Sequence, residues 1–159
     1  MQYRTGIGYD IHRLVRGSRL VVGGIEIPYS KRLLGHSDAD VLLHALCDAL
    51  LGAVNAGDIG EHFPDSDPKY KNIASIILLK EVALILKHKG YKVNNIDIVV
   101  VLEKPKFSPY KDAIRKKISG ALKVKIEDVS VKAKTNEGLD EVGKGNAVAC
   151  FTVVTITKR

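Results

Sequence analysis

The stretch GYDIHR, residues 8–13, places a carboxylate and an imidazole two positions apart. Successive side chains of an extended strand point to opposite faces, so Asp10 and His12 point the same way. Gly6 and Gly8 fall on that face and leave space beside them. The other face carries three apolar side chains: Ile7, Tyr9 and Ile11. An acid and an imidazole so placed suit a metal ion, but two ligands do not make a site.

A predicted helix over residues 38–54, DADVLLHALCDALLGAV, offers the third ligand. Asp40, His44 and Asp48 are spaced four apart and form one narrow polar stripe on an otherwise apolar helix. Two imidazoles and one carboxylate match zinc, and three protein ligands leave one position open for catalysis. We expect Asp40 or Asp48 to hold the second imidazole nitrogen of His44. The alternative is a core histidine satisfied by a neighbouring aspartate.

Two further segments suit phosphates. GHSDAD places His36, Ser37 and Asp38 at the mouth of this helix, where free N–H groups favour an anion, although simple capping explains one of them. Asp58 in GDIG has the chemistry to bind a ribose diol. Turn formation is the plain alternative for Asp58 and for Asp65, which lies in FPDSDP.

The segment KAKTNEG brings three polar residues to the end of a predicted strand: Lys134, Thr135 and Glu137. Lysine and threonine suit phosphate oxygens, and a glutamate beside them suits a magnesium ion that bridges phosphates. An ordinary polar loop is the alternative.

Strands are predicted over residues 3–12, 96–103, 129–134 and 147–157, with a hairpin at Gly23 and Gly24. Helices are predicted to start at Ser37 or Asp38, after Asn72, and at Ser108. We therefore predict an α+β fold in two layers: one domain over residues 1–159, a mixed four-stranded sheet with helices on one face, and a small N-terminal hairpin. Two strands are apolar on both faces, which indicates a homo-oligomer.

The composition limits the class of protein. The 159 residues are 45% hydrophobic and 27% charged, which fits a globular domain, and the formal net charge of +7 favours anionic partners. Cys47 and Cys150 lie in apolar runs and read as buried thiols. The chain shows no apolar leader and no membrane-spanning run, so we expect a cytoplasmic protein without membrane contact. A basic RNA-binding domain would need clustered aromatic residues, and we expect no nucleic-acid partner.

Five motifs, in order and spacing, resemble the 2-C-methyl-D-erythritol 2,4-cyclodiphosphate synthase family: GYDIHR, GGIEIPY, LLGHSDADVLLHALCDALLGA, GDIGEHFPDSDP and KAKTNEG. The resemblance covers essentially the whole chain. It implies an enzyme of the non-mevalonate isoprenoid pathway that cyclises a cytidine diphosphate ester of methylerythritol 2-phosphate and releases CMP. It also implies a homotrimer with sheets facing the threefold axis and active sites between subunits.

The resemblance assigns roles to residues of this chain. Zinc would be held by Asp10, His12 and His44, and magnesium or manganese by Glu137, with His36 and Thr135 as further catalytic residues. The implied substrate contacts are His36, Ser37, Asp58, Gly60, Asp65, Pro105, Lys106, Phe107, Ser108, Ala133, Lys134, Thr135 and Lys144.

The segment LDEVGKGN departs from the family pattern, with Asp140, Glu141 and Lys144 where that pattern has other residues. The family's central cavity can lodge an isoprenoid diphosphate, and two acids there would repel it. Ala39 also stands at a position where the family commonly has glycine. Two rivals remain on chemistry alone: a non-catalytic module that binds zinc and cytidine nucleotides, and a different zinc phosphotransferase or hydrolase.

Overall fold

The computed structural model describes residues 2–159, so Met1 of the predicted domain lies outside the described residues. A five-stranded mixed sheet has the order β4-β1-β7-β5-β6, and a two-stranded sheet pairs β2 with β3. Only the β5–β6 pair of the large sheet is parallel. The strands are β1 (Tyr3–Arg16), β2 (Arg19–Val22), β3 (Ile25–Pro28), β4 (Lys31–Leu33), β5 (Tyr91–Val101), β6 (Val129–Lys134) and β7 (Ala147–Lys158).

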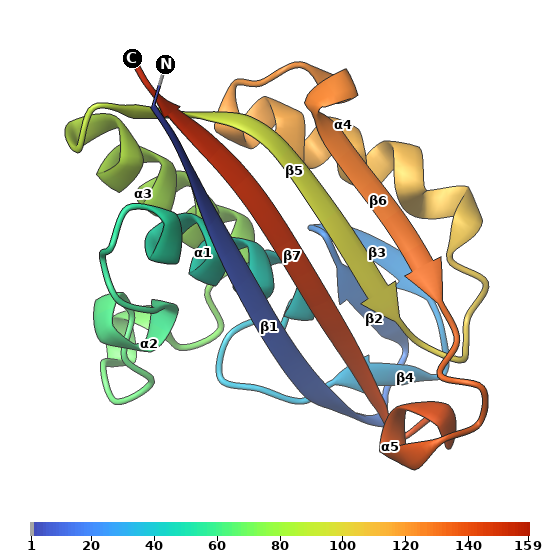
Figure 1. The fold of residues 1–159 in the computed structure, drawn as a ribbon. Helices are drawn as coiled ribbons and strands as arrows, with labels where there is room; N and C mark the ends of the chain where they lie inside the picture. The colour runs from blue at the N-terminus through green and yellow to red at the C-terminus, as the bar shows by residue number, and fades with distance from the viewer. Residues whose placement is uncertain (1) are drawn as a thin grey trace.

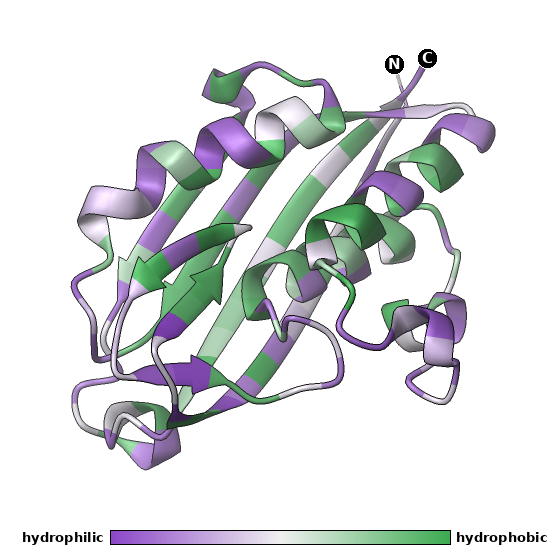
Figure 2. Ribbon diagram, turned by 180° about the vertical axis from the view of Figure 1, so that it is seen from behind, coloured by the Kyte–Doolittle hydropathy of each residue, from purple (hydrophilic) through white to green (hydrophobic). Residues whose placement is uncertain are grey.

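The three long helices lie on one face of the sheet, behind the strands in the view of Figure 1. Figure 2 shows the molecule from behind, so that the helices face the viewer and the β2–β3 hairpin lies in front of the large sheet. The helical segments are α1 (Val41–Ala53), α2 (Ile59–His62), η1 (Pro68–Tyr70), α3 (Ser75–His88), η2 (Ser108–Tyr110), α4 (Lys111–Leu122), η3 (Ile126–Asp128) and α5 (Asp140–Gly143). The predicted two-layer α+β class is confirmed.

The sheet has one more strand than the four predicted. β4 contains three residues and pairs with the end of β1 through Leu14 and Leu33. Three residues are too few for a side-chain alternation to identify a strand. Its partner β1 runs on to Arg16, four residues past the predicted end.

The three predicted helix starts were wrong: each helix begins two or three residues later than predicted. α1 is capped by Asp40 rather than by Ser37 or Asp38. α3 begins after Ala74 without a side-chain cap, because Asn72 has a left-handed backbone with φ +60°. Ser108 opens the short η2 turn, and α4 follows it. In each case a loop or a 3₁₀ turn precedes the helix, and such turns share their sequence signals with helix caps.

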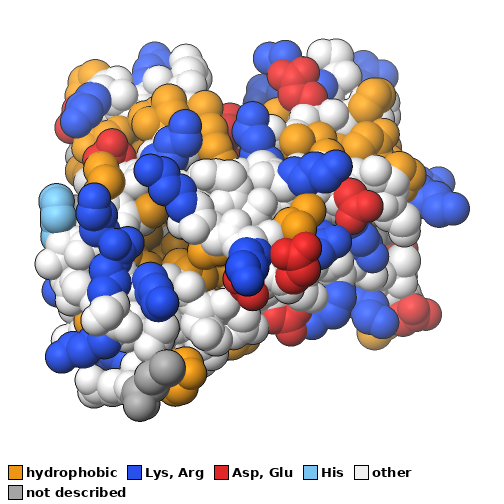
Figure 3. Space-filling view, turned by 90° about the horizontal axis from the view of Figure 1, so that it is seen from above, with side chains coloured by type: hydrophobic (Ala, Val, Ile, Leu, Met, Phe, Trp, Pro, Cys, Tyr) orange, Lys and Arg blue, Asp and Glu red, His pale blue; other side chains and the backbone are white. Residues whose placement is uncertain are grey.

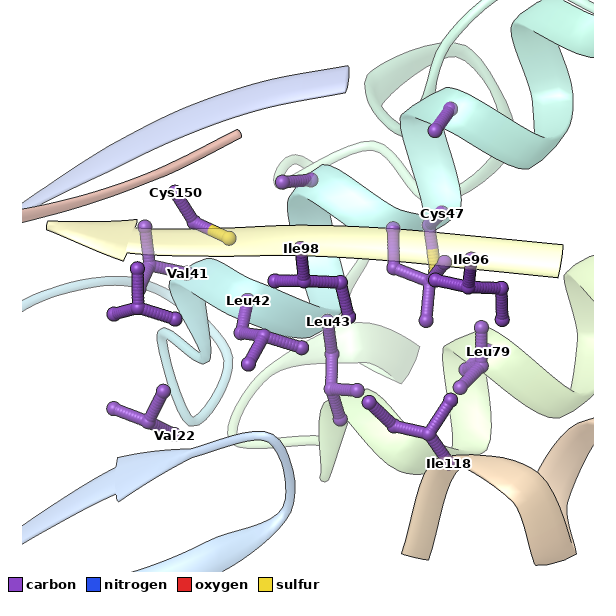
Figure 4. Close-up of a cluster of buried hydrophobic side chains, with 14 of the residues drawn as sticks. Val22, Val41, Leu42, Leu43, Cys47, Leu79, Ile96, Ile98, Ile118 and Cys150 are labelled. Carbon is purple, nitrogen blue, oxygen red and sulfur yellow. The ribbon is translucent and has the colours of Figure 1, made fainter. Parts of the chain in front are cut away.

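The core lies between the sheet and the helices. Figure 4 shows Ile96 and Ile98 of β5 among side chains of α1, α3 and α4, including Leu43, Leu79 and Ile118. These five side chains are essentially inaccessible to solvent. Cys47 and Cys150 are buried free thiols, as predicted.

Two glycines bring β1 into backbone contact with α1. A Cβ atom on Gly8 would lie 1.9 Å from the carbonyl oxygen of Ala45, and one on Gly6 would lie 1.9 Å from that of Ala49. Both distances are far below van der Waals contact, so no other residue fits without moving the helix. The strand that carries Asp10 and His12 therefore lies as close to α1 as two backbones can pack.

Asp40 ties the hairpin to the start of α1. Its carboxylate is completely buried and accepts hydrogen bonds from the N–H groups of Gly23 (2.9 Å), Gly24 (2.6 Å) and Leu43 (3.1 Å). Burial, with the nearby charge of Asp38, raises the pKa of Asp40 to about 6, although the three N–H donors offset part of this effect. The carboxylate thus fixes the hairpin turn over the helix start.

The face of the sheet away from the helices is open. Ile7, Tyr9, Phe151 and Val153 form an apolar patch there, with 71%, 49%, 45% and 41% of their surface exposed. Exposed apolar surface of this kind is typical of an interaction site.

The positive charge is spread over the surface seen from above. Lys and Arg side chains gather closely at the left of this view and mix with Asp and Glu at its centre and right (Figure 3). No helix within residues 2–159 is long and apolar enough to cross a membrane.

We expect Gly8→Ala to destabilise the protein by about 3 kcal/mol, because the added methyl group collides with the backbone of α1. Gly120→Ala is the matched control, since Gly120 lies within α4 with nothing within 4 Å of an added Cβ. The control should be neutral or stabilising by about 0.5–1 kcal/mol. Urea denaturation at one fixed protein concentration measures both, and equal midpoints for the two variants would contradict the close packing of β1 on α1.

Candidate active site

Asp10, His12 and His44 converge at the contact between β1 and α1. The Oδ2 atom of Asp10 lies 3.0 Å from Nε2 of His12 and 3.1 Å from Nδ1 of His44. The two imidazole nitrogens are 3.2 Å apart. Tetrahedral zinc with ligand bonds near 2.0–2.1 Å separates its ligand atoms by about 3.3 Å. The three donor atoms therefore already have the spacing of one face of a zinc tetrahedron.

In each imidazole, the nitrogen that points away from the other two donor atoms has partners that orient the ring. Nδ1 of His12 lies 2.9 Å from the carbonyl oxygen of Leu34. Because a carbonyl oxygen only accepts, Nδ1 carries the proton and donates, which leaves the Nε2 lone pair toward the site. Nε2 of His44 lies 2.9 Å from Oγ of Ser75 and 3.1 Å from Oγ of Ser37. A protonated Nε2 leaves Nδ1 of His44 free to bind a metal. The donor set fits a metal ion in chemistry as well as in spacing.

The prediction that Asp40 or Asp48 holds His44 was wrong. Asp40 is occupied by backbone N–H groups, and Asp48 accepts from the N–H of Ile59 at 2.8 Å. Asp40 caps α1 and binds the hairpin turn, and Asp48 binds the first residue of α2. The partners of His44 come instead from the loop before α1 and from the first residue of α3.

The charges of the three residues are coupled. Burial alone would raise the pKa of Asp10, but hydrogen bonds and charges of His12 and His44 outweigh it and hold the pKa well below its usual range. Burial alone would lower the pKa of His12, but the hydrogen bond and charge of Asp10 raise it above its usual value. Without a metal, the site thus favours an ionised Asp10 beside a His12 that readily takes a proton.

A cavity opens beside the three residues. Polar residues that line it include His36, Ser37 and Asp65, and its apolar lining consists of Ile59, Phe63, Tyr70, Ile73 and Leu78. Of the predicted substrate contacts, His36, Ser37, Gly60 and Asp65 line this cavity. Asp58 is exposed at its edge and caps α2 by accepting from the N–H of Glu61 at 3.0 Å.

His36 and Ser37 do not sit at the helix mouth as predicted. α1 begins at Val41, and the carboxylate of Asp40 occupies the N–H of Leu43 at 3.1 Å. An anion in the cavity would therefore contact the side chains of His36 and Ser37 rather than the free N–H groups of the helix.

Most of the other predicted substrate contacts lie at the ends of β5 and β6. These parallel strands bring Val101 beside Lys134, and the N–H of Leu102 donates to the carbonyl of Lys134 at 2.9 Å. Pro105, Lys106, Phe107 and Ser108 follow the end of β5, Ala133 and Lys134 are the last residues of β6, and Thr135 and Glu137 follow them. None of these residues lines the cavity at Asp10.

Local contacts fix the loop after β6. Oε1 of Glu103 accepts from the N–H of Asn136 at 2.7 Å, and the hydroxyl of Thr135 donates to Oε1 of Glu137 at 3.0 Å. Glu137 has a left-handed backbone with φ +53°. Phe107 is 3% exposed, so its side chain belongs to the core and only its backbone is available to a ligand.

The segment that departs from the family pattern borders the open face. Lys144 pairs with Glu141 at 2.9 Å, and Glu141 also accepts from Asn146 at 2.9 Å. Asp140 and Glu141 line a hollow together with the apolar side chains of Tyr9, Ile11, Val101, Val142, Ala149 and Phe151. Lys144 is thus neutralised by its own neighbour.

Sequence reasoning missed three contributors to the site. Ser75 contacts His44, Leu34 orients His12 through its carbonyl, and Glu103 holds the Thr135–Glu137 loop. The contact of Leu34 uses its backbone carbonyl, which every residue type has, so the sequence could not identify it. Ser75 lies near a predicted helix start, and an exact helix boundary would have drawn attention to it.

Comparison with known proteins identifies close relatives. A family model described as the YgbB family matches residues 3–157. The 2-C-methyl-D-erythritol 2,4-cyclodiphosphate synthase of Alkaliphilus metalliredigens is 54% identical over 153 residues, which is 96% of each chain.

Solved structures agree with the sequence comparison. IspF of Plasmodium falciparum in complex with CDP superposes with a TM-score of 0.86 at 34% identity, over 99% of this chain and 97% of that one. The bifunctional IspDF of Campylobacter jejuni has a TM-score of 0.96 at 37% identity; the match covers 99% of this chain and 43% of the longer one.

Asp10→Asn should lower the pKa of His12 in chelator-treated protein, because it removes the carboxylate that raises this pKa. With a folded pKa above the ordinary 6.5, His12 contributes stability that is complete below that value and is lost as the pH rises through the folded pKa. The variant should lose this pH dependence. NMR titration of the ring protons measures the shift.

Asp112→Asn serves as the control for this titration, because Asp112 is an exposed carboxylate paired with Arg115 at 3.1 Å. It should leave the titration of His12 unchanged. A His12 pKa that is the same in Asp10→Asn and in the native protein would refute the coupling.

Proposed function

The chain belongs to the YgbB family and has the activity of the synthases that match it over nearly their whole length, and on that premise we propose which residues perform each part of the reaction. The enzyme converts 4-diphosphocytidyl-2-C-methyl-D-erythritol 2-phosphate to 2-C-methyl-D-erythritol 2,4-cyclodiphosphate and releases CMP. An oxygen of the 2-phosphate forms a bond to the β-phosphorus. The bond from that phosphorus to the CMP oxygen breaks, and CMP leaves with the electron pair.

The observation that carries the assignment of residues is the convergence of Asp10, His12 and His44 on one cavity. These three would hold zinc, which when bound supplies a Lewis acid for a phosphoryl oxygen. The attacking phosphate is largely anionic at neutral pH, so the chain needs no strong general base. Its residues mainly have to position the two phosphates and neutralise charge.

The cavity residues would bind the methylerythritol phosphate portion. His36 and Ser37 would offer polar side chains to its oxygens, and Asp65 lines the same cavity. The apolar side chains of Phe63 and Leu78, which also line it, would exclude water and suit the carbon skeleton. Asp58 and the backbone of Gly60, at the edge of this cavity, would contact the ribose hydroxyls.

The residues at the ends of β5 and β6 would bind the CDP portion. Pro105, Lys106, Phe107 and Ser108, with Ala133 and Lys134, would form the cytosine pocket, and Thr135 would contact the diphosphate. Glu137 would hold magnesium or manganese, which when bound offsets negative charge on the diphosphate. The solved relative with CDP bound supports a cytidine nucleotide as the ligand.

A second copy of the chain would complete the site. The metal-binding cavity contains none of the predicted cytidine contacts of the same chain, except for the ribose contact at Gly60. The apolar patch of Ile7, Tyr9, Phe151 and Val153 on the open face offers the surface for association. We propose a homotrimer in which the patches meet and each active site combines two chains.

The hollow at the open face would face the centre of this trimer. Asp140 and Glu141 place negative charge on its rim, and Lys144 is paired with Glu141. An isoprenoid diphosphate would therefore be repelled from the centre.

His44→Ala should abolish CMP release while the fold stays intact, because one of the three metal ligands is lost. The assay measures CMP release in zinc-replete buffer, and circular dichroism checks the fold. His88→Ala is the control, since His88 lies at the end of α3 and outside the cavity. A near-normal rate in the His44 variant would argue against metal-assisted transfer.

Mixing two inactive variants should restore activity if the site lies between chains. His44→Ala disables the metal half and Glu137→Ala the nucleotide half. When an equal mixture is refolded into random trimers, every trimer that contains both variants has one site with an intact metal half and an intact nucleotide half. The expected activity of the mixture is roughly one quarter of the native activity.

A mixture of His44→Ala with His12→Ala is the control for this experiment, because both variants disable the metal half. It should show no recovery. Absence of recovery in the first mixture, with subunit exchange verified by mass spectrometry, would place the whole site within one chain.

A further inference from the structure

Ser75 is buried between a ligand of the proposed metal and a carboxylate. It is the first residue of α3 and is completely inaccessible to solvent. Its Oγ lies 2.9 Å from Nε2 of His44 and donates its proton to Oδ1 of Asp38. Its backbone N–H donates to the other oxygen of Asp38 at 3.0 Å. The chain thus links Asp38, Ser75 and His44 in one row of hydrogen bonds.

The single proton of the Ser75 hydroxyl group determines which atoms donate and which accept along this row of hydrogen bonds. A serine hydroxyl has one proton, and Ser75 uses it in the hydrogen bond that it donates to the carboxylate of Asp38. Toward His44 the Ser75 oxygen can then only accept, so Nε2 of His44 must carry the proton. In the neutral form of this imidazole, which metal binding requires, the lone pair is therefore on Nδ1, the nitrogen 3.1 Å from Oδ2 of Asp10.

We propose that Ser75 and Asp38 are positioning residues that fix the tautomer and ring orientation of His44 for metal binding. This inference rests on the proposed metal site at Asp10, His12 and His44. Ligating imidazoles commonly gain affinity from such partners on their second nitrogen. Here the partners come from outside α1, so α3 and the loop before α1 share control of the ligand.

Backbone contacts hold the pair in place. The N–H of Asp38 donates to the carbonyl of Ile73 at 3.1 Å, and the N–H of Asn72 donates to the carbonyl of His36 at 2.9 Å. The N–H of Asp40 donates to Oδ1 of Asp38 at 3.2 Å. The loop before α1 and the segment before α3 are therefore joined at His36 and at Asp38, and the loop is closed locally at Asp40.

The arrangement also gives Ser37 a separate role. Its Oγ accepts from the N–H of Ala39 at 3.1 Å and lies 3.1 Å from Nε2 of His44. Since Nε2 carries a proton, Ser37 does not donate to it. The Ser37 hydroxyl proton is then available to a ligand in the cavity that Ser37 lines.

The test measures the zinc Kd of the full-length protein by competition with a chromogenic chelator. Ser75→Ala should raise the Kd by about 10- to 100-fold, as loss of such partners typically does. Ser119→Ala is the matched control: it removes another buried hydroxyl, which donates to the carbonyl of Lys116 at 3.1 Å on α4. Its Kd should stay native.

A second variant separates the hydrogen bond from the packing. Ser75→Cys keeps a side chain of similar shape, but sulfur is a weak acceptor, so this variant should also raise the Kd. In zinc-loaded native protein, the proton on Nε2 of His44 should give an NMR signal that exchanges slowly with solvent. Both Ser75 variants should speed that exchange.

The outcomes are distinct. If native protein fails to bind one zinc per chain, the proposed metal site is wrong, and the inference falls with it. If native protein binds zinc and both Ser75 variants bind it within twofold of the native Kd, only the positioning role is overturned. If the zinc-free variants have a lower melting temperature but an unchanged zinc Kd, Ser75 has only a structural role, and the positioning role is likewise overturned.

Discussion

The backbone contact between β1 and α1 is the constraint on which the site depends. Gly8 precedes Asp10 by two residues, and the helix carbonyl against Gly8 belongs to Ala45, the neighbour of His44. The absence of two Cβ atoms therefore brings a strand and a helix close enough for an aspartate and two imidazoles to place their donor atoms about 3 Å apart. A wider separation would leave these side chains too short to share one ion.

The acidic residues around α1 each join a different segment to this contact. Asp40 holds the hairpin turn, Asp38 holds the start of α3, and Asp48 holds the start of α2. Each carboxylate accepts backbone N–H groups that would otherwise lack a partner in the interior. The helix that supplies His44 is thus also the element to which the walls of the cavity are attached. Metal binding and cavity shape cannot be changed independently.

Much of this arrangement was predictable from the sequence. The alternation in GYDIHR placed Asp10 and His12 on one face, and the spacing of Asp40, His44 and Asp48 identified a polar stripe on a buried helix. These are periodic signals, which depend on one element alone. The apolar strands likewise indicated an exposed apolar sheet face.

The remaining features arise from contacts between elements, which periodicity does not contain. Asp48 looked like a partner of His44 because both lie on one side of α1, but the start of α2 takes its carboxylate. Ser75 reaches His44 only because the start of α3 packs against the loop before α1. β4 was missed because three residues carry no pattern.

The pairing of β1 with β7 has a further consequence for how the domain can be joined to others. Tyr3 lies opposite Thr157, so the two chain ends leave the sheet together at one corner (Figure 1). Asp10 lies seven residues along β1 from Tyr3, which is about 23 Å in an extended strand. A fused module can therefore be attached at either end without obstructing the metal ligands, and a short linker between the ends would permit circular permutation.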